Sequence, residues 1–410
     1  MAAITSTDRP PILALDGAAS AIASARRAVV ADRYANSFAA EWRSFAGLLS
    51  IVDEWRELAA RSLEPNVFYE PAFALEAAAV FGADAGAVLV WSGTTPRKLL
   101  GFFPARIELR RYGVKLPVLS GWTHPYAPLG TPLIEREAAE LVVAAWLAYL
   151  ANDRELPGLL LLPYLPEQGP FAAALDAITR RAQMPATDFN RHSRALLMPG
   201  SERLLYVERT LGQHKHKELR RSVRRLGDTG AILFTVATEP EAVLAAMRDF
   251  FTLEARGWKG QAGTAAAFRD DIRRFVTAAV AGLAKEGKVA VNRILIDGRT
   301  IALTITLRSA DTAWFWKIAY DEDFAQHSPG VILSFCVTED LIEDPSVVRT
   351  DSCATANHPM IDHIWRERLV LCDRLIGVRP GAGFAVARRL EPARGLAIAA
   401  AKGLRARFHR

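Results

Sequence analysis

Three apolar runs separated by polar turn residues dominate the pattern in the second half of the chain. Val289–Ile296, Thr300–Leu307 and Thr312–Tyr320 are rich in β-branched or aromatic residues, which is typical of strands. Asp297-Gly298 between the first two runs predicts a tight hairpin turn. Ser328-Pro329-Gly330 then predicts the start of a helix, because a proline at the first helical position has no N–H to lose. The pattern therefore predicts a meander that ends at a helix N-terminus.

The first half repeats this order of helix, hairpin, strand, helix and strand. The predicted helices are Trp42–Arg61, Pro71–Val80 and Glu135–Asn152, and the predicted strands are Val88–Trp91, Lys98–Arg106, Leu116–Leu119 and Gly158–Leu162. Tyr126–Thr131 stands where the second half has Ser-Pro-Gly, and it carries only one glycine. We therefore expect two similar domains. The predicted bounds are 1–40 for a flexible N-terminal tail, 41–192 for the first domain, 193–228 for a basic linker helix, 229–379 for the second domain and 380–410 for a basic C-terminal tail helix.

The second half also carries a family resemblance. Its strand order, followed by Tyr320-Asp321, Phe324-Ala325 and Ser328-Pro329-Gly330, resembles the acetyltransferase domain of the CelD/BcsL family. That family belongs to the GNAT superfamily and is named for an association with bacterial cellulose synthesis. The basic run His216–Arg221 and the segment Leu253–Lys259 match upstream. The resemblance implies an α/β (α+β) fold of two tandem GNAT-like domains, each a mixed, mostly antiparallel sheet flanked by helices. We expect the first domain to be degenerate.

The resemblance implies direct transfer of an acetyl or longer acyl group from acyl-CoA. The acceptor is expected to be an amine or hydroxyl of a small molecule or saccharide, in exopolysaccharide or envelope metabolism. Free amides at a helix N-terminus attract a pyrophosphate. The plain alternative is that the Ser-Pro-Gly turn only begins a helix. The residues expected to bind acyl-CoA are Lys317, His327, Ser328, Gly330, Val331 and Ile332.

Candidate catalytic residues follow from the same alignment of motifs. Asp351 ends the run Ser346–Thr350 and matches an aspartate of the family, so it is the expected general base. Its alternative role is structural, as an acceptor of backbone hydrogen bonds. Tyr320 is expected to return a proton to the leaving thiolate, and its alternative role is packing. The residues expected to bind the acceptor substrate are Glu254, Arg256, Trp258 and Trp365.

The segment after Asp351 departs from the family. A Tyr-Lys pair is expected there and is absent, whereas Asn357, His358 and His363 are gained. His358 is therefore a further candidate for the catalytic base. No metal is expected, because the spacing of the ligand-type residues matches no common zinc pattern. Those residues are Asp351, Cys353, His358, Asp362 and His363.

Composition narrows the class of protein. The chain has 410 residues, of which 50% are hydrophobic, which is enough for two ordinary cores. Its net charge of +6 gives a mild preference for anionic ligands. Three cysteines make no disulfide framework, and neither a secretory signal nor a membrane-spanning run is predicted. We therefore expect a cytoplasmic protein.

Two basic segments leave alternatives open. His214–Arg225 and Arg388–Arg410 have helical periodicity without interleaved aromatics, so DNA is not an expected partner. Tandem GNAT domains also occur in the FemABX aminoacyltransferases, which this architecture resembles and which use charged tRNA as donor. The Arg-rich C-terminal tail also suits an anionic membrane surface. A non-catalytic binding protein with the GNAT fold is the third class. The sequence predicts no oligomeric state.

Overall fold

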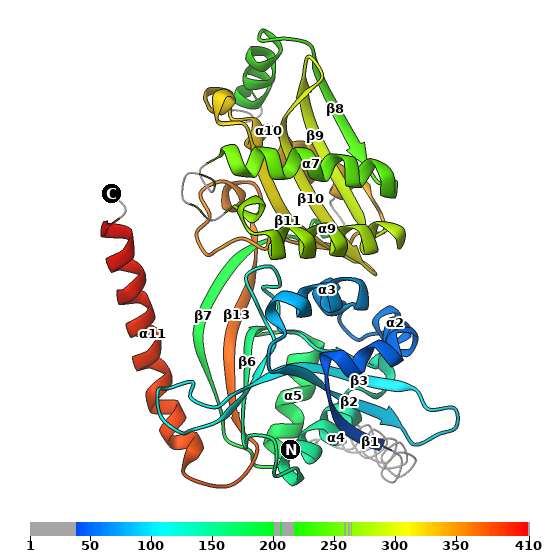
Figure 1. Cartoon of the computed structure of the whole chain (residues 1–410), viewed down its shortest axis with the longest axis vertical. Coiled ribbons are helices and arrows are strands. Elements are labelled where there is room, and N and C mark those ends of the chain that lie inside the picture. Colours follow the sequence, from blue (N-terminus) through cyan, green and yellow to red (C-terminus); the bar gives the residue numbers. More distant parts are fainter. Residues whose placement is uncertain are drawn as a thin grey trace, which may run out of the picture.

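The computed structural model describes residues 38–200, 206, 217–257, 260, 263 and 265–408. The strands within them form one sheet in the order β1-β2-β3-β4-β6-β13-β7-β12-β11-β10-β9-β8, and β5 pairs with β3 at its side. Figure 1 shows the first half of this sheet below, the second half above, and the long strands β7 and β13 running between them. Most of the predicted N-terminal tail and part of the predicted linker helix lie outside the described residues.

The elements have the following bounds. The strands are β1 (Phe38–Ser44), β2 (Ala85–Ser92), β3 (Leu99–Glu108), β4 (Val118–Gly121), β5 (Leu133–Ile134), β6 (Leu159–Pro166), β7 (Ala186–Leu197), β8 (Ile232–Ala237), β9 (Val289–Ile296), β10 (Arg299–Ser309), β11 (Thr312–Tyr320), β12 (Arg349–Asp351) and β13 (Glu367–Gly377). The α-helices are α2 (Val52–Ala60), α3 (Pro71–Phe81), α4 (Ala139–Asn152), α5 (Pro170–Arg181), α7 (Pro240–Arg256), α9 (Asp270–Lys285), α10 (Pro329–Glu343) and α11 (Gly383–Phe408). Short 3₁₀ helices include η2 (Phe45–Ile51), η7 (Glu322–His327) and η8 (Ile361–His363).

The two halves of the sheet have equivalent strand orders when each is followed from its outer edge to the centre, β1-β2-β3-β4-β6-β13 in one and β8-β9-β10-β11-β12-β7 in the other. In the first half β4 pairs in parallel with β6, and in the second half β11 pairs in parallel with β12. The last strand of each half crosses to the other half, so that β13 pairs with β6 and β7 pairs with β12. β7 and β13 also pair with each other at the centre. The protein is therefore built of two similar halves that exchange one strand.

Helices cover the sheet and join the halves through one apolar core. α7 and α9 pack on one face of β9–β11, and α10 covers the opposite face. α3 of the first half packs against α9 of the second. Phe73 of α3 lies 5.4 Å from Phe275 of α9 and 5.6 Å from Trp316 of β11, measured between ring centroids. Burial of these aromatic faces holds the halves together.

Local sequence patterns located most elements well. β9 and β11 have the predicted bounds, and α3 and α10 begin at the predicted prolines. Asp297 and Gly298 have φ values of 48° and 80°, as a tight hairpin turn requires. The predicted C-terminal tail helix corresponds to α11. None of the described helices is both long enough and apolar enough to cross a bilayer.

Two predictions about organisation are wrong. The helical spacing of Trp42–Arg61 predicted one helix, but Phe38–Ser44 forms strand β1 and pairs with β2. Ladder hydrogen bonds to a neighbouring strand outweigh local spacing there. The predicted boundary between residues 192 and 193 falls inside β7, and the predicted second domain contributes β13 to the sheet of the first half. Strand exchange leaves no local signal, because it depends only on pairing between distant segments.

Candidate functional site

A cleft opens where the parallel strands β11 and β12 stop pairing. Thr312–Trp314 pair with Arg349–Asp351, and β12 ends there, whereas β11 continues to Tyr320. A cleft of about 720 Å³ lies beyond this point. A strand edge that has lost its partner presents N–H and C=O groups for hydrogen bonding. The walls are Leu253, Glu254, Gly257, Phe315–Tyr320, Glu322, Ala325, Ser328–Val331, Ser352–Thr355 and His358–Ile361.

A β-bulge lies in the β11 wall of this cleft. Residues 305 and 306 of β10 pair with Lys317 and Phe315 respectively, so Trp316 is the extra residue. The bulge bends β11 close to the point where it leaves β12. The indole Nε1 of Trp316 donates to the carbonyl oxygen of Tyr126 at 2.9 Å. The first half therefore holds the bulged strand in place.

The N-terminus of α10 reaches the cleft through Ser328–Val331. The amide of Ser328 donates to Ala325, and its carbonyl accepts the amides of Val331 at 3.0 Å and Ile332 at 3.1 Å. The amides of Ser328, Val331 and Ile332, three of the residues predicted to bind acyl-CoA, therefore already have acceptors within the chain. Gly330 contacts the Tyr320 ring so closely that an added Cβ would lie 3.2 Å from Cδ1. The first turn of α10 contains no acidic residue, which preserves the positive end of its dipole.

The corresponding place in the first half is closed. The amide of Gly130, in the segment between β4 and β5, donates to the carbonyl oxygen of Tyr164 at 3.0 Å. A Cβ on Gly130 would lie 2.0 Å from the carbonyl oxygen of Pro163, so only glycine fits. A void of about 10 Å³ remains nearby, and the first turn of α4 carries Glu140. The single glycine of Tyr126–Thr131 thus seals this half of the sheet.

Lys317 connects the cleft to the first half. Its Nζ lies 4.0 Å from the ring centroid of Tyr126 and 5.3 Å from that of Trp316, within cation–π range. The sequence predicted Lys317 as a ligand-binding residue, and the structure places it in the cleft wall. Sequence reasoning missed Tyr126 as its neighbour, because nothing local to either residue indicates the contact.

The end of α7 adds a carboxylate to the wall. Glu254 is 6% exposed, and its Oε2 accepts the amide of Ala266 at 2.8 Å. The C-terminal end of a helix carries a partial negative charge, which adds to that of Glu254. Arg256 is exposed in the last turn of α7 and is not a wall residue. Trp258 lies outside the described residues.

Asp351 lies behind the cleft in a buried ion pair. Its Oδ2 accepts a hydrogen bond from Nη2 of Arg194, and its Oδ1 accepts the amide of Cys353 at 3.0 Å. Arg194 belongs to β7, and its Nη1 donates to the carbonyl oxygen of Pro128 at 2.8 Å. Asp351 is 3% exposed and does not line the cleft. This geometry matches the structural alternative for Asp351 and presents no carboxylate to an acceptor.

Three further titratable side chains line the cleft beside Glu254, Lys317 and Glu322. Burial lowers the pKa of His358 below its ordinary value, and the amide of Met360 donates to its Nδ1 at 3.3 Å. The neutral ring therefore carries its proton on Nε2. Burial raises the pKa of the Tyr320 phenol, and it raises the pKa of the Cys353 thiol well above its usual range. At neutral pH all three groups are uncharged hydrogen-bond donors.

Other predicted site residues lie away from the cleft wall. Trp365 is fully buried, and its Nε1 donates to Oγ1 of Thr338 at 2.9 Å. The side chain of Ile332 is 1% exposed in the core under α10, and His327 ends η7 half-buried. Their positions in a motif do not reveal which way their side chains point. Among the residues with described positions, no group of three or more His, Cys, Asp and Glu side chains is placed to hold a metal.

A buried histidine near Lys317 makes stability depend on pH. His124 stacks on Phe81 with ring centroids 4.3 Å apart, and burial, followed by the charges of Arg106 and Lys317, lowers its pKa to about 3. Between pH 6.5 and pH 3 the unfolded chain therefore binds a proton that the folded chain excludes. Stability from this group is full above about pH 6.5 and falls by about 1.4 kcal/mol per pH unit below it.

We expect His124→Phe to make the free energy of unfolding less sensitive to acid than in the parent protein. Urea unfolding near neutral pH and in mild acid gives the slope of the free energy of unfolding against pH for the variant and for the parent protein. His192→Phe is the matched control, because this histidine is only partly buried, on β7. Equal slopes for the parent protein and His124→Phe would contradict the assigned effect.

Comparison with known proteins agrees with the arrangement of strands. Residues 213–355 match the family model described as the acetyltransferase (GNAT) domain. No curated protein matches the chain by sequence. The crystal structure of FemX has a TM-score of 0.55 at 8% identity and covers 79% of this chain and 95% of its own. A conserved protein of unknown function from Bacteroides thetaiotaomicron VPI-5482 has a TM-score of 0.50 at 11% identity, covering 80% and 96% respectively.

These comparisons confirm the predicted fold class, a mixed α/β architecture of GNAT type with a mostly antiparallel sheet flanked by helices. At 8% and 11% sequence identity, the two solved structures show only that the fold is shared. The matched family segment ends at residue 355, within the wall of the cleft, and includes β11, α10 and β12. Membership of the CelD/BcsL family stays a prediction.

Proposed function

We propose that this chain is an acyltransferase that holds acyl-CoA in the cleft between β11 and the segment after β12. One observation carries the proposal: the edge of β11 that β12 leaves after Trp314, the N-terminus of α10 and a volume of about 720 Å³ coincide at a single cleft. The match of residues 213–355 to an acetyltransferase domain supports it. The closed gap between β4 and β6 in the first half favours one donor site per chain.

The donor lies along β11 in this proposal. Its pyrophosphate binds at Gly330, where the close backbone and the positive end of the α10 dipole favour an anion. Its pantetheine arm runs along the edge of β11 that β12 leaves after Trp314 and pairs with it as an added strand does. The thioester then reaches the bulge at Trp316, where backbone N–H groups polarise the carbonyl. Lys317 lies beside this position.

Transfer is direct. The acceptor nucleophile attacks the thioester carbonyl, its proton is removed, the carbon–sulfur bond breaks, and the thiolate of coenzyme A takes a proton. Tyr320 supplies the proton to sulfur, because its raised pKa keeps the phenol protonated. In this proposal the Nε2–H of His358 donates a hydrogen bond to the bound substrate, because its Nδ1 accepts the amide of Met360. The raised pKa of Cys353 disfavours an acyl-cysteine intermediate, since the thiolate is the nucleophilic form.

The acceptor enters at the end of α7. Glu254 and the negative end of the α7 dipole attract a cationic group, so an amine acceptor is favoured over a plain hydroxyl. In this proposal Glu254 takes one proton from the cationic amine before the attack, because only the neutral amine has a lone pair, and the proton lost as the amide forms passes to water. A small amine or an amino group on a saccharide both meet this description.

Titration of the purified protein with acetyl-CoA and longer acyl-CoAs, followed by thermal unfolding, tests the proposal. A donor that binds only the folded state stabilises it by about 2.7 kcal/mol at a hundredfold excess over Kd. We expect Gly330→Glu to abolish this stabilisation, because it places bulk against Tyr320 and a negative charge at the pyrophosphate position.

Two variants serve as controls for this titration. Gly330→Gln has similar bulk without charge, so stronger binding by Gly330→Gln than by Gly330→Glu identifies the electrostatic part. Gly227→Glu adds the same side chain at a position with no neighbour within 4 Å, and it is expected to bind like the parent protein. Absence of stabilisation by every acyl-CoA tested on the parent protein would overturn the proposal.

A charged tRNA is the second candidate donor. The helical residues 217–227 expose Arg220, Arg221, Arg224 and Arg225, which suits a phosphate backbone, and this observation favours the expectation drawn from the FemABX resemblance. Ribonuclease sensitivity of the transfer reaction separates this donor from acyl-CoA. Replacement of both Arg220 and Arg224 with glutamate is expected to weaken the binding of a tRNA donor and to leave the binding of acyl-CoA unchanged.

A further inference from the structure

The outermost strand of the second half leaves one edge of the sheet open. β8 stands at the end of the strand order and, among the described strands, pairs with β9 alone. Figure 1 shows β8 at the outer edge of the second half, on the side away from β11. The amide of Asp297 donates to the carbonyl oxygen of Ala231. Because such bonds alternate along an antiparallel pair, the backbone groups of Ile232, Phe234 and Val236 point away from β9.

Exposed apolar side chains flank this open edge. On β8, Leu233 is 56%, Phe234 is 41% and Val236 is 57% exposed. Phe234 and Val236 are two residues apart in one strand, so they share one face of the sheet. Val236 pairs with Asn292, whose side chain donates a hydrogen bond to Asp340 of α10 at 2.9 Å. The face that carries Phe234 and Val236 is therefore the face that α10 covers.

The opposite edge of the sheet, at β1, is protected by side chains. The amide of Trp42 donates to the hydroxyl of Tyr149 in α4 at 3.1 Å. Glu41 and Arg43 of β1 form an ion pair at 2.8 Å, and charges on an edge strand oppose pairing with another chain. β8, by contrast, contains neither a charged residue nor a proline. An apolar edge without such protection requires a cover, because it otherwise leads to aggregation.

Charges of opposite sign lie near the two ends of β8 on the α10 face. The helical residues 217–227 precede β8, and their buried Leu226 belongs to the same apolar cluster as α10. The exposed basic residues before β8 are Lys217, Arg220, Arg221, Arg224 and Arg225, and the exposed acidic ones are Glu218 and Asp228. At the other end of the strand, the bond between Asn292 and Asp340 places the last turns of α10 beside Val236. Those turns expose Glu339, Asp340 and Glu343.

We propose that β8 pairs antiparallel with β8 of a second copy of this chain, so that the two sheets form one continuous sheet. The twofold axis of this pair is perpendicular to the sheet and keeps the α10 faces of both copies on one side. Phe234 and Val236 of one copy then pack against the same two residues of the other. The basic start of each strand meets the acidic end of its partner, which favours the antiparallel pair over a parallel one. This inference is independent of acyl transfer, because no residue of β8 lines the cleft.

Sedimentation velocity of the full chain over a range of concentrations tests the proposal. We expect a dimer at high concentration, and slower hydrogen–deuterium exchange in the peptide that covers β8 than in the dilute protein. Val236→Lys is expected to weaken the dimer at least about tenfold, because it replaces an apolar contact from each copy with a charge.

Val236→Pro is a second variant that acts on the backbone. Proline there removes an N–H that points away from β9, so the hydrogen bonds between β8 and β9 remain and pairing with a second copy is weakened. Far-UV circular dichroism and the melting temperature of each variant in dilute solution check that it folds.

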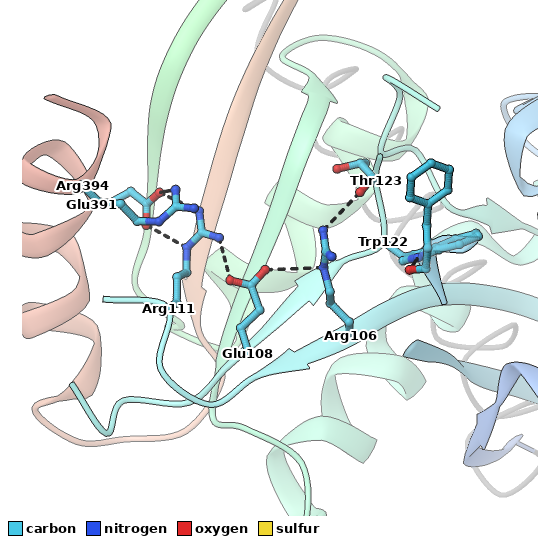
Figure 2. Close-up of polar contacts among 8 residues, drawn as sticks. Arg106, Glu108, Arg111, Trp122, Thr123, Glu391 and Arg394 are labelled. Carbon is cyan, nitrogen blue, oxygen red and sulfur yellow. Dashed lines mark hydrogen bonds and ion pairs between the residues drawn. The ribbon is translucent and has the colours of Figure 1, made fainter. Parts of the chain in front are cut away.

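Val114→Lys is the matched control, because Val114 is 50% exposed in the loop between β3 and β4 of the first half. Ion pairs of Arg111 with Glu108 at 3.0 Å and with Glu391 at 2.7 Å hold this loop to α11 (Figure 2). The control is therefore expected to fold and to form the dimer like the parent protein.

Three outcomes contradict the proposed dimer. They are a parent protein that is monomeric at every concentration, a dimer that both Val236 variants leave unchanged, and a dimer that Val114→Lys weakens as much as Val236→Lys does. A monomer in which the β8 peptide is protected from exchange assigns the edge to another segment of this chain and equally overturns the proposal.

Discussion

Replacing Arg194 with methionine is expected to lower the free energy of unfolding by about 3–5 kcal/mol, because it leaves the buried Asp351 carboxylate without its cation. The two side chains are 1% and 4% exposed, so water cannot take the place of the lost partner. The carbonyl oxygen of Pro128 loses its donor as well. Urea unfolding followed by far-UV circular dichroism measures the change.

Arg191→Met is the matched control for this measurement. Arg191 lies on the same strand and pairs with Glu167, but 67% of its side chain is exposed, so we expect a cost below about 1 kcal/mol. Adding Asp351→Asn to Arg194→Met removes the stranded charge, and asparagine still accepts the Cys353 amide. The double variant is therefore expected to regain part of the loss. A double variant no more stable than Arg194→Met would contradict the ion pair as the cause.

The Arg194–Asp351 pair also explains how strand exchange supports the cleft. Arg194 comes from the first half on β7, whereas Asp351 ends β12 and directly precedes the wall segment that begins at Ser352. The carboxylate fixes the amide of Cys353, whose φ of 52° is uncommon for a residue with a side chain. The position of this wall therefore depends on a side chain from the other half.

Tyr320→Phe is expected to lower kcat for acyl transfer by about 10²- to 10⁴-fold, because it removes the proposed proton donor to the leaving thiolate. The ring that contacts Gly330 stays, so the binding of acyl-CoA and the melting temperature are expected to change little. The raised pKa of Tyr320 adds a second expectation. The phenol stays protonated to above its ordinary titration range, so activity does not fall through this group until above about pH 10.

Steady-state kinetics with a saturating donor, beside a binding titration of the same variant, checks this prediction. Tyr164→Phe removes a hydroxyl from a half-exposed tyrosine outside the cleft and is expected to leave kcat unchanged. An unchanged kcat for Tyr320→Phe would leave Tyr320 with a packing role only. Loss of donor binding together with kcat would instead assign the hydroxyl to the binding of the donor.

Much of the cleft was predictable because its parts are local. The Ser328–Gly330 turn starts α10 through the fixed φ of proline, and the bounds of β11 follow from its apolar run. Lys317, Tyr320 and Gly330 are close in sequence on either side of this turn, so the chain brings them to one place without distant contacts. Glu254 was predicted from the family pattern, and His358 was predicted from the segment that departs from that pattern. Both residues line the cleft.

The role expected for Asp351 depended on an environment that the sequence does not state. A carboxylate at the end of a strand suits a base in a half-open cleft and suits an ion pair in a core equally well. Burial by Arg194, which is 157 residues away in the chain, distinguishes the two. Trp365 is similar, because the same indole fits a substrate wall or the hydrogen bond to Thr338 in the core.

The sequence by itself determined the strands, turns and helix starts of each half, because side-chain period, proline and glycine act over a few residues. It also determined that the Ser-Pro-Gly turn occurs once, in the second half. Only the tertiary structure decided that β7 and β13 change places, that Gly130 closes the gap in the first half, and that Arg194 neutralises Asp351. These outcomes depend on long-range strand register and on desolvation, and both arise only when distant segments pack together.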